Sequence, residues 1–451
     1  MTSVLSTIQA ISAAERLDSR GNPTIQVSIT TKDGIFKAIV PSGASKGDYE
    51  AVEIRDNDTK RYHGKGVRTA VNNVNDILAP AILKKQFVLP KDVDEIDRFM
   101  ISKDGSDDKS MLGANAILGI SMAVWRAAAA AKGFPLYQFI KDYADTKEPY
   151  VMPCPFFNVL NGGVHSGNTM AFQEMMIAPV GAQSLTEAVR MGSEVYQELK
   201  EVIKGRYGTT ATGIGDEGGF APPISSPRQA LDLLTTAAEN CDYSGKVKFA
   251  MDPASSEFYN KDDGTYNMGF KKTKNDPTAQ KTDICSKSDM MGLYHELMDD
   301  YPLVLLEDPF AQDDWETWAE FNKNCAIPLV GDDLLATNKK RIEMAREKKA
   351  CNALLLKINQ IGTITEAIEA AKQAYSYGWS VFVSHRSGET TDDFIADVVV
   401  GLRAGHLKSG SPCRGERVAK YNRLMDIEDE IAQRGQSYKF AGHNFRYAAT
   451  M

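Results

Sequence analysis

The sequence predicts an α/β protein in which a smaller α+β region precedes a β/α barrel. Three observations support this prediction. Five short apolar runs in the second half of the chain each stop at an ionisable residue, as buried strands with a polar end do. The last four of these end residues are 25 to 28 residues apart, about the length of one strand–helix unit. The chain has 451 residues, which exceeds one ordinary core and favours two domains.

The first part of the chain is expected to combine a β-hairpin with helices. Residues 22–41 alternate apolar and polar side chains around Lys32-Asp33-Gly34, a common turn sequence. Helical patterns follow at roughly residues 64–85, 92–102 and 112–131. Between the hairpin and the helices, Pro41 to Gly47 is rich in small residues, which predicts a mobile loop at 41–48.

A change of pattern marks the predicted domain boundary. The segment Asp145-Thr-Lys-Glu-Pro149 is polar and carries a proline. We therefore expect an N-terminal α+β capping domain at residues 1–146 and a barrel domain at residues 147–451. After the boundary, strand and helix patterns alternate, which is typical of a parallel sheet.

One strand–helix unit of the second part is well marked. The apolar run Leu354 to Ile358 is followed by a turn, and Thr363 with Glu366 forms a capping box that opens a helix ending at Gly378. By contrast, residues 260–288 are polar, and we expect them to form a surface excursion with little regular structure.

Composition narrows the class of protein. With 43% hydrophobic and 25% charged residues, the chain is typical of ordinary globular proteins. The net charge of -8 argues against nucleic acid or an anionic membrane as the main partner, although a local pocket can still bind an anion. Residues 1–12 lack the pattern of a secretory signal, and the apolar stretch 114–131 contains Asn115 and Arg126, which favours a packed helix. The six cysteines form no C-x-x-C pair, which indicates thiols in a reducing compartment, the cytoplasm.

The five end residues of the apolar runs form the candidate site. They are Asp252, Glu307, Asp332, Lys357 and His385. In a β/α barrel the C-terminal strand ends meet at one mouth, which would bring these side chains together. The three carboxylates offer only oxygen ligands, which favours Mg²⁺ or Mn²⁺ over Zn²⁺. The alternative for each acid is a carboxylate that pairs with a nearby lysine or caps the next helix.

Lys357 ends an otherwise apolar strand, so its amine is expected to project into the same mouth. To act as a base near neutral pH, its pKa has to fall by about 3 units from ~10.4, roughly 4 kcal/mol. Desolvation and neighbouring cations lower the pKa of a lysine. The alternative is a lysine that neutralises the three acids.

Further candidates lie in glycine-rich turns and after the last apolar run. Glu174 and Glu217 stand in such turns, as does His165, and the glycines let backbone approach a ligand closely. Taken alone, Glu217 is better explained by a plain turn, and His165 by a hydrogen-bonded loop histidine. The segment Ser384 to Gly388 combines a guanidinium with small donors, which suits a phosphate group. Lys408 adds a second cation, and the alternative for Arg386 is an ion pair with nearby acids.

These residues stand within longer motifs through which the chain resembles the enolase family. The resemblance covers nearly the whole chain and keeps the order of the family's motifs. The N-terminal motifs are Asp18-Ser-Arg-Gly-Asn-Pro-Thr24, Pro41-Ser-Gly-Ala-Ser45 and Lys109 to Gly119. The motifs of the second part are Asn158 to Gly163, Gly215 to Gly219, Glu307 to Phe310, Gly331 to Leu334, Leu354 to Gln360, Ser384 to Thr390 and Glu416 to Asn422.

The resemblance implies a fold and an activity. The fold would be a small α+β domain followed by a modified eight-stranded, TIM-like barrel whose early strands break the all-parallel rule. The activity would be the Mg²⁺-dependent, reversible dehydration of 2-phosphoglycerate to phosphoenolpyruvate, a carbon–oxygen lyase step of glycolysis and gluconeogenesis. It also implies a cytoplasmic homodimer and two Mg²⁺ ions per active site, the second bound with the substrate.

The resemblance further implies the metal ligands and the base. Asp252, Glu307 and Asp332 would hold the high-affinity Mg²⁺, and Ser45, in the mobile loop, would close over the second. Lys357 would take the C2 proton of 2-phosphoglycerate.

The remaining candidates would form the acid side and hold the substrate. Glu217, helped by Glu174, would protonate the departing C3 hydroxyl. Lys408 would hold the substrate carboxylate. The phosphate would be held by Arg386 and Ser387 next to Ser384, and His165 and His385 would line the closed site.

Several positions depart from the family pattern and suggest a divergent eukaryotic paralogue. Lys46 stands where threonine is usual, and we hypothesise a shifted Mg²⁺ dependence from this extra cation. The other departures are Tyr49, Leu335, Ala336 and Gly415. One alternative is a non-catalytic protein that keeps the enolase fold for binding or structure, against which the complete set of acid, base and ligand positions argues. The other is a superfamily enzyme acting on a different carboxylate acid, against which the phosphate features argue.

Overall fold

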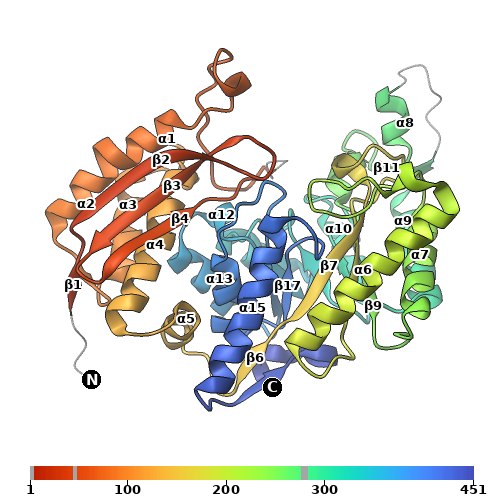
Figure 1. Ribbon diagram of the computed structural model, residues 1–451. Coiled ribbons are helices and arrows are strands. Elements are labelled where there is room, and N and C mark those ends of the chain that lie inside the picture. The colour runs from red at the N-terminus through yellow and green to blue at the C-terminus, as the bar shows by residue number, and fades with distance from the viewer. Residues whose placement is uncertain (1–4, 44–47, 276–282) are drawn as a thin grey trace.

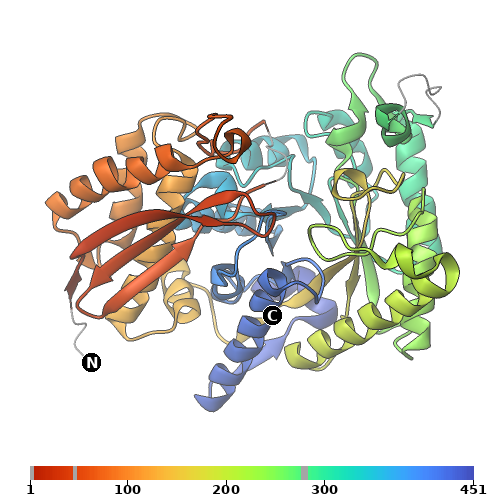
Figure 2. The ribbon, with the colours of Figure 1, turned by 45° about the horizontal axis from the view of Figure 1, so that its top comes forward.

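The computed structural model describes residues 5–43, 48–275 and 283–451. It shows a small N-terminal domain, red to orange in Figure 1, beside an eight-stranded barrel with surrounding helices. Figure 2 shows the same two parts after a turn of the molecule. Half of the predicted mobile loop, residues 44–47 with Ser45 and Lys46, lies outside the described residues.

An antiparallel sheet forms one layer of the N-terminal domain. Its strands β2 (Ala10–Leu17), β3 (Pro23–Thr31) and β4 (Gly34–Ile39) lie in sequence order. The predicted hairpin is β3–β4, with the turn at Lys32 and Asp33. Alternate residues of β3 are fully buried, as the period-two pattern indicates. The sequence analysis did not predict β2, whose small and charged residues give only a weak strand pattern.

Helices cover this sheet. α4 (Ala114–Lys132) packs against β3 and β4, and most of its residues are buried inside the protein. It is the one helix of the described residues long and apolar enough to cross a membrane, and its burial confirms the predicted packed helix. The other helical segments of this domain are the 3-10 turn η1 (Tyr62–Gly64), α1 (Arg68–Asn72), the π-helical turn η2 (Asn73–Leu78), α2 (Ala79–Lys85), α3 (Val93–Asp104) and α5 (Leu136–Ala144).

The barrel closes in the order β13-β14-β15-β16-β17-β7-β8-β9. Its strands are β7 (Cys154–Asn161), β8 (Glu174–Ala178), β9 (Lys248–Asp252), β13 (Leu303–Glu307), β14 (Leu329–Gly331), β15 (Ala353–Leu356), β16 (Ser380–Ser384) and β17 (His406–Lys408). β8 runs antiparallel to both of its neighbours, whereas the other neighbouring strands pair in parallel. The expected break in the all-parallel rule therefore lies at β8.

Alternate strand residues fill the barrel interior. Leu305, Leu355 and Phe382 belong to one apolar cluster with residues of the other strands, while their chain neighbours pack toward the helices. The 3-10 segment η6 (Gly442–Thr450) adds Phe445 to this cluster, 5.0 Å from the ring of Phe156. These contacts close one end of the barrel and leave the other end for the candidate site.

An outer layer of helices surrounds the strands. Its members are α6 (Leu185–Tyr207), α7 (Pro227–Asn240), α9 (Lys287–Asp300), α10 (Trp315–Asn322), α11 (Lys339–Lys348), α12 (Ile358–Ile361), α13 (Ile364–Ser376), α14 (Phe394–Gly401) and α15 (Gly415–Gln433). The side chain of Thr363 accepts from the backbone N–H of Glu366, which confirms the N-cap of α13. The second half of the predicted capping box is different, because the Glu366 carboxylate accepts from the Thr363 hydroxyl at 2.7 Å. Short paired strands are β1 (Ser6–Thr7) with β5 (Val88–Leu89), and β6 (Tyr150–Met152) with β18 (Tyr438–Phe440).

The expectation of little regular structure at residues 260–288 was wrong. β10 (Tyr259–Asn260), β11 (Thr265–Asn267) and β12 (Ile284–Cys285) form a small sheet, and α8 (Phe270–Asn275) follows β11. The ring of Tyr266 is fully buried, and its hydroxyl donates to Asp314 at 2.8 Å. Buried aromatic side chains such as Tyr266 therefore order this segment. Its polar average composition concealed the short strands from the sequence pattern.

Candidate active site at the barrel mouth

The strand ends place the candidate side chains at one mouth. Asp252 and Glu307 are the last residues of β9 and β13, while Asp332 and Lys357 directly follow β14 and β15. Because these strands are parallel, their C-terminal ends meet. Lys408, the last residue of β17, joins them.

Glu174 reaches the same mouth by a different route. It is the first residue of β8, and it lies opposite Asp252 in the register of β8 with β9. Because β8 is antiparallel to its neighbours, the start of this strand lies where the other strands end. The carboxylate therefore joins the others without following an apolar run.

Three buried carboxylates converge at the mouth. Asp252, Glu307 and Asp332 each offer an oxygen, and these oxygens lie within 4.8 Å of one another. Glu307 is fully buried, and its Oε2 has no hydrogen-bond partner among the described residues. A buried carboxylate oxygen without a donor is costly unless something else satisfies it. An all-oxygen set of this kind fits a hard divalent cation such as Mg²⁺.

Lys408 lies at the centre of the acids. Its Nζ is 2.7 Å from Glu307, 3.1 Å from Glu174 and 3.2 Å from Asp252. Burial works against the charged amine, but these carboxylates raise its pKa well above the usual value. Lys408 therefore carries a positive charge at the base of the mouth.

Lys357 contacts the other end of the acid cluster. Its amine forms an ion pair with Asp332, whose second carboxylate oxygen accepts from the amide of Gln360 at 2.9 Å. Burial alone would lower the pKa of Lys357, but the charge of Asp332 raises it. Lys357 therefore does not have the lowered pKa that a neutral base needs as long as Asp332 pairs with its amine.

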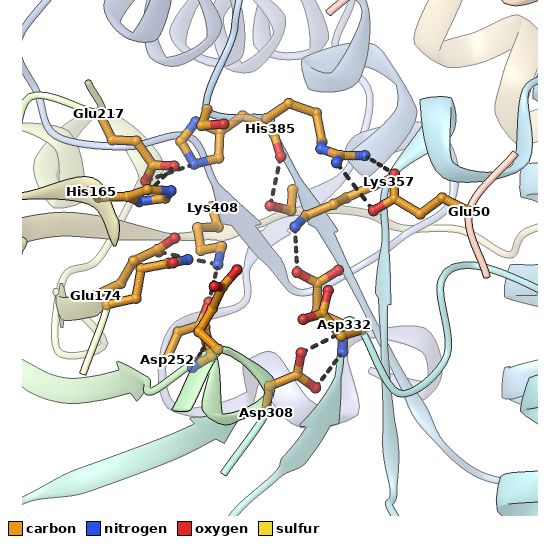
Figure 3. A pocket seen from close by; sticks show the side chains of 17 residues that line it. Glu50, His165, Glu174, Glu217, Asp252, Asp308, Asp332, Lys357, His385 and Lys408 are labelled. Carbon is orange, nitrogen blue, oxygen red and sulfur yellow. Dashed lines mark hydrogen bonds and ion pairs between the residues drawn. The ribbon is translucent and has the colours of Figure 1, made fainter. Parts of the chain in front are cut away.

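Glu217 lies across the mouth from Lys357, beside His165 and His385 (Figure 3). Its Oε2 accepts from Asn158 at 2.9 Å and lies 3.3 Å from Nε2 of His385, while His165 Nδ1 is 3.7 Å from Oε1. Burial opposes ionisation of Glu217, but the facing imidazoles and the guanidinium of Arg417 hold its pKa well below the usual value. Glu217 is therefore an ionised carboxylate in this arrangement.

The tautomer of His385 follows from its other neighbour. Arg417 Nη1 lies 2.5 Å from Nδ1 of His385, and because a guanidinium only donates, Nδ1 is the acceptor. Burial lowers the pKa of His385 to about 3, so the ring is neutral. Its one N–H is therefore on Nε2, facing Glu217.

Glu174 and Glu217 share one side of the mouth with opposite protonation. Burial, followed by the charge of Glu217, raises the pKa of Glu174 to about 8. At neutral pH the proton of this pair therefore lies mainly on Glu174. One ionised and one protonated carboxyl group beside each other can pass a proton to a bound group.

Arg386 lies at the rim with the two serines of its motif. Its guanidinium donates to Glu50 at 2.9 and 3.1 Å and to Asn359 at 2.9 Å. Ser384 and Ser387 line the same cavity. The alternative that Arg386 pairs with an acid therefore holds in this structure, and the acid comes from the N-terminal domain.

Sequence reasoning missed several residues of the mouth. Asp308 and Asp333 directly follow two of the predicted ligands, and the doubled acids were the signal that could have found them. Asp308 accepts from the backbone N–H groups of Asp332 and Asp333 at 3.0 and 2.7 Å, which fixes the turn. Glu50 had no such signal, because its place depends on how the two domains meet.

Two protein-family models match this chain. The model described as Enolase, C-terminal TIM barrel domain, matches residues 149–449. The model described as Enolase, N-terminal domain, matches residues 8–140. Together they cover most of the chain and divide it between the small domain and the barrel.

Proposed function

The chain belongs to the enolase family, and from that membership we propose that it interconverts 2-phosphoglycerate and phosphoenolpyruvate in a Mg²⁺-dependent lyase reaction. One observation carries the proposal. Lys357 and Asp332 lie on one side of the mouth, and Glu217 and His165 lie on the other, with Lys408 between them (Figure 3). The two sides can hold a base and an acid on opposite faces of a small substrate.

The proposed reaction develops negative charge that the site has to stabilise. The C2 proton of 2-phosphoglycerate lies next to a carboxylate that is already anionic, so its removal places further charge on that group. Asp252, Glu307 and Asp332 would hold one Mg²⁺, and Ser45, outside the described residues, would contribute to a second site. When bound, Mg²⁺ stabilises this developing charge more than it stabilises the ground state.

The side chains of the mouth supply the proton transfers. Lys357 would accept the C2 proton on its amine, and the electron pair left behind would form the C2–C3 double bond as the C3–oxygen bond breaks. Hydroxide is a poor leaving group, so the Glu174 and Glu217 pair would donate a proton and let the oxygen leave as water. The raised pKa of Glu174 supports this acid role at neutral pH.

The other residues would hold the substrate. Lys408 would pair with the carboxylate, and Arg386 with Ser384 and Ser387 would bind the phosphate. His165 and His385 would line the closed site around Glu217. We also propose a cytoplasmic homodimer that acts in glycolysis and gluconeogenesis, on the grounds of family membership.

The test is an assay of the purified chain with 2-phosphoglycerate. We expect phosphoenolpyruvate to accumulate with Mg²⁺ and not with a chelator, as followed by ultraviolet absorbance. Lys357→Ala should lower kcat by about 10²–10⁴-fold, the usual effect of losing a positioned base. Lys340→Ala is the matched control, because that side chain is 83% exposed.

Two results would contradict the proposal. A chain that leaves 2-phosphoglycerate unchanged in ample Mg²⁺ would be the non-catalytic paralogue. Turnover of a carboxylate acid without a phosphate, and not of 2-phosphoglycerate, would make it another enzyme of the superfamily.

A further inference from the structure

A second cavity of about 300 Å³ lies at the end of the barrel away from the mouth. Trp379, in its wall, directly precedes β16, and the last residue of that strand, Ser384, lines the mouth. The segment that joins the two domains and the segment η6 complete the wall. In Figure 1 this end of the barrel is the lower one, where the C-terminus lies beside β6. The two cavities share no lining residue.

The wall of this cavity is strongly basic. Its cationic residues are Lys147, Lys372, Arg403 and Arg446, and its one acidic residue is Asp145. Within the described part of the chain, none of the four cations lies in an ion pair with a carboxylate, although the whole chain has a net charge of -8. Positive charge gathered without neutralisation attracts anions.

The hydrogen bonds of these cations leave capacity for a ligand. Arg403 is 3% exposed, and its two terminal nitrogens donate to the backbone oxygens of Ala449, at 3.3 Å, and Met451. Its Nε has no hydrogen-bond partner among the described residues. This nitrogen is itself buried, so Arg403 adds positive charge to the wall rather than a contact with a ligand. Lys372 and Arg446 likewise donate to backbone oxygens, of Tyr143 at 3.4 Å and Ala326 at 3.3 Å.

Aromatic rings form the rest of the wall. Tyr375, Trp379 and Tyr447 line the cavity. The hydroxyl of Tyr375 donates to the backbone oxygen of Leu402 at 3.0 Å, which fixes that ring. Tyr447 is 59% exposed, so much of its ring is open to a ligand. Flat rings beside cations favour a ligand that has both a ring and an anionic group.

We propose that this cavity binds a nucleoside monophosphate, with the phosphate on Lys147, Lys372 and Arg446 and the base against the aromatic rings. A cavity of about 300 Å³ is at the small end of the range for ligand sites and suits a molecule of this size. Lys147, which is exposed, would approach the phosphate from the rim.

Calorimetric titration with adenosine 5′-monophosphate tests this inference. The Arg386→Gln variant serves as the protein, because its mouth is impaired as a phosphate site while the second cavity is unchanged. We expect saturable binding of the nucleotide. Adenosine and inorganic phosphate should each bind at least about tenfold more weakly, because each makes only half of the contacts.

Substitutions in the wall locate the binding. Lys147→Gln with Lys372→Gln, both at exposed positions, should weaken nucleotide binding at least about fivefold, and Trp379→Leu should weaken it as well. Lys340→Gln is the matched control and should leave affinity unchanged, since that lysine lies outside the wall.

Three outcomes would overturn the inference. One is the absence of saturable nucleotide binding. The second is an affinity that the wall substitutions leave unchanged, which would place the ligand elsewhere. The third is inorganic phosphate binding as tightly as the nucleotide, which would mean that the rings take no part.

Discussion

Glu50 and Arg386 form a buried ion pair that joins the two domains across the rim of the mouth. The carboxylate accepts from the guanidinium at 2.9 and 3.1 Å, and the side chains are 9% and 6% exposed. Arg386 is also the residue that we propose for the substrate phosphate. The carboxylate of Glu50 therefore holds the guanidinium that an incoming phosphate needs, and the two anions compete for it.

Glu50→Gln should strengthen the binding of phosphoenolpyruvate, because a neutral amide competes less for Arg386. We expect Kd to fall about three- to tenfold, or about 1 kcal/mol. Calorimetry on a Lys357→Ala background measures this without turnover. Glu257→Gln removes another acid of the same mouth that is not paired with Arg386, and it should change Kd by less than about twofold. Equal affinities of the Glu50→Gln and parent proteins would contradict the competition.

Glu307→Gln should remove the stabilisation of the protein by Mg²⁺. A metal that binds only the folded state raises Tm, and Glu307 is the fully buried member of the three converging carboxylates. We expect the Mg²⁺-dependent rise in Tm to be lost and the affinity for Mn²⁺ to fall by at least about tenfold. Glu320→Gln, at an exposed position on α10, should keep the full shift. Identical shifts in both variants would mean that the metal lies elsewhere.

Asp97 should make stability fall as pH rises from about 4 to about 6. Burial raises the pKa of this carboxyl group from 3.8 to about 6, against donors that include Thr365 and Trp125. Between these two values the folded protein holds a proton that the unfolded chain has lost, so deprotonation favours unfolding. Above about pH 6 the loss of folding stability is complete and amounts to about 3 kcal/mol.

Asp97→Asn should remove this dependence. Urea unfolding of both proteins across the same pH range measures it, and the variant should gain stability relative to the parent as pH rises. Parallel pH profiles of the two proteins would show that the Asp97 carboxyl group titrates normally.

Leu355→Ala should destabilise the protein by about 2–5 kcal/mol, because it opens a cavity in the barrel interior. Leu17→Ala, at a leucine that is 58% exposed, should cost less than about 0.5 kcal/mol. Denaturant unfolding compares the two. A cost below about 1 kcal/mol for Leu355→Ala would mean that the interior collapses around the smaller side chain.

The sequence predicted the barrel and most of its mouth because strand ends carry a local signal. An apolar run that stops at Asp252, Glu307 or Lys357 shows both the strand and the group at its end. The expected roles of these residues stay predictions. Glu50 could not be predicted as a partner of Arg386, because that contact depends on how the domains dock. The protonation of Lys357 was equally hidden, because it depends on Asp332 lying within contact distance of the amine.

Two structural elements escaped prediction for opposite reasons. Most apolar residues of β2 are alanines, and only Ile11 is buried, so the strand gives no clear alternating pattern. Its pairing with β3 fixes the strand instead. The small sheet within residues 259–285 has its aromatic anchors spread among many polar residues. In both cases partners distant in the sequence, rather than local propensity, decide the structure.

The reversed direction of β8 divides the rim into two parts that can change separately. Glu174 sits where the chain enters a strand, whereas Lys357 sits where the chain leaves one, so different connecting segments carry the proposed proton donor and the proposed proton acceptor. An insertion before β8 would shift the donor and leave the acceptor in place. Such a scaffold lets the segment that carries the proposed acid diverge while the segment that carries the proposed base is kept.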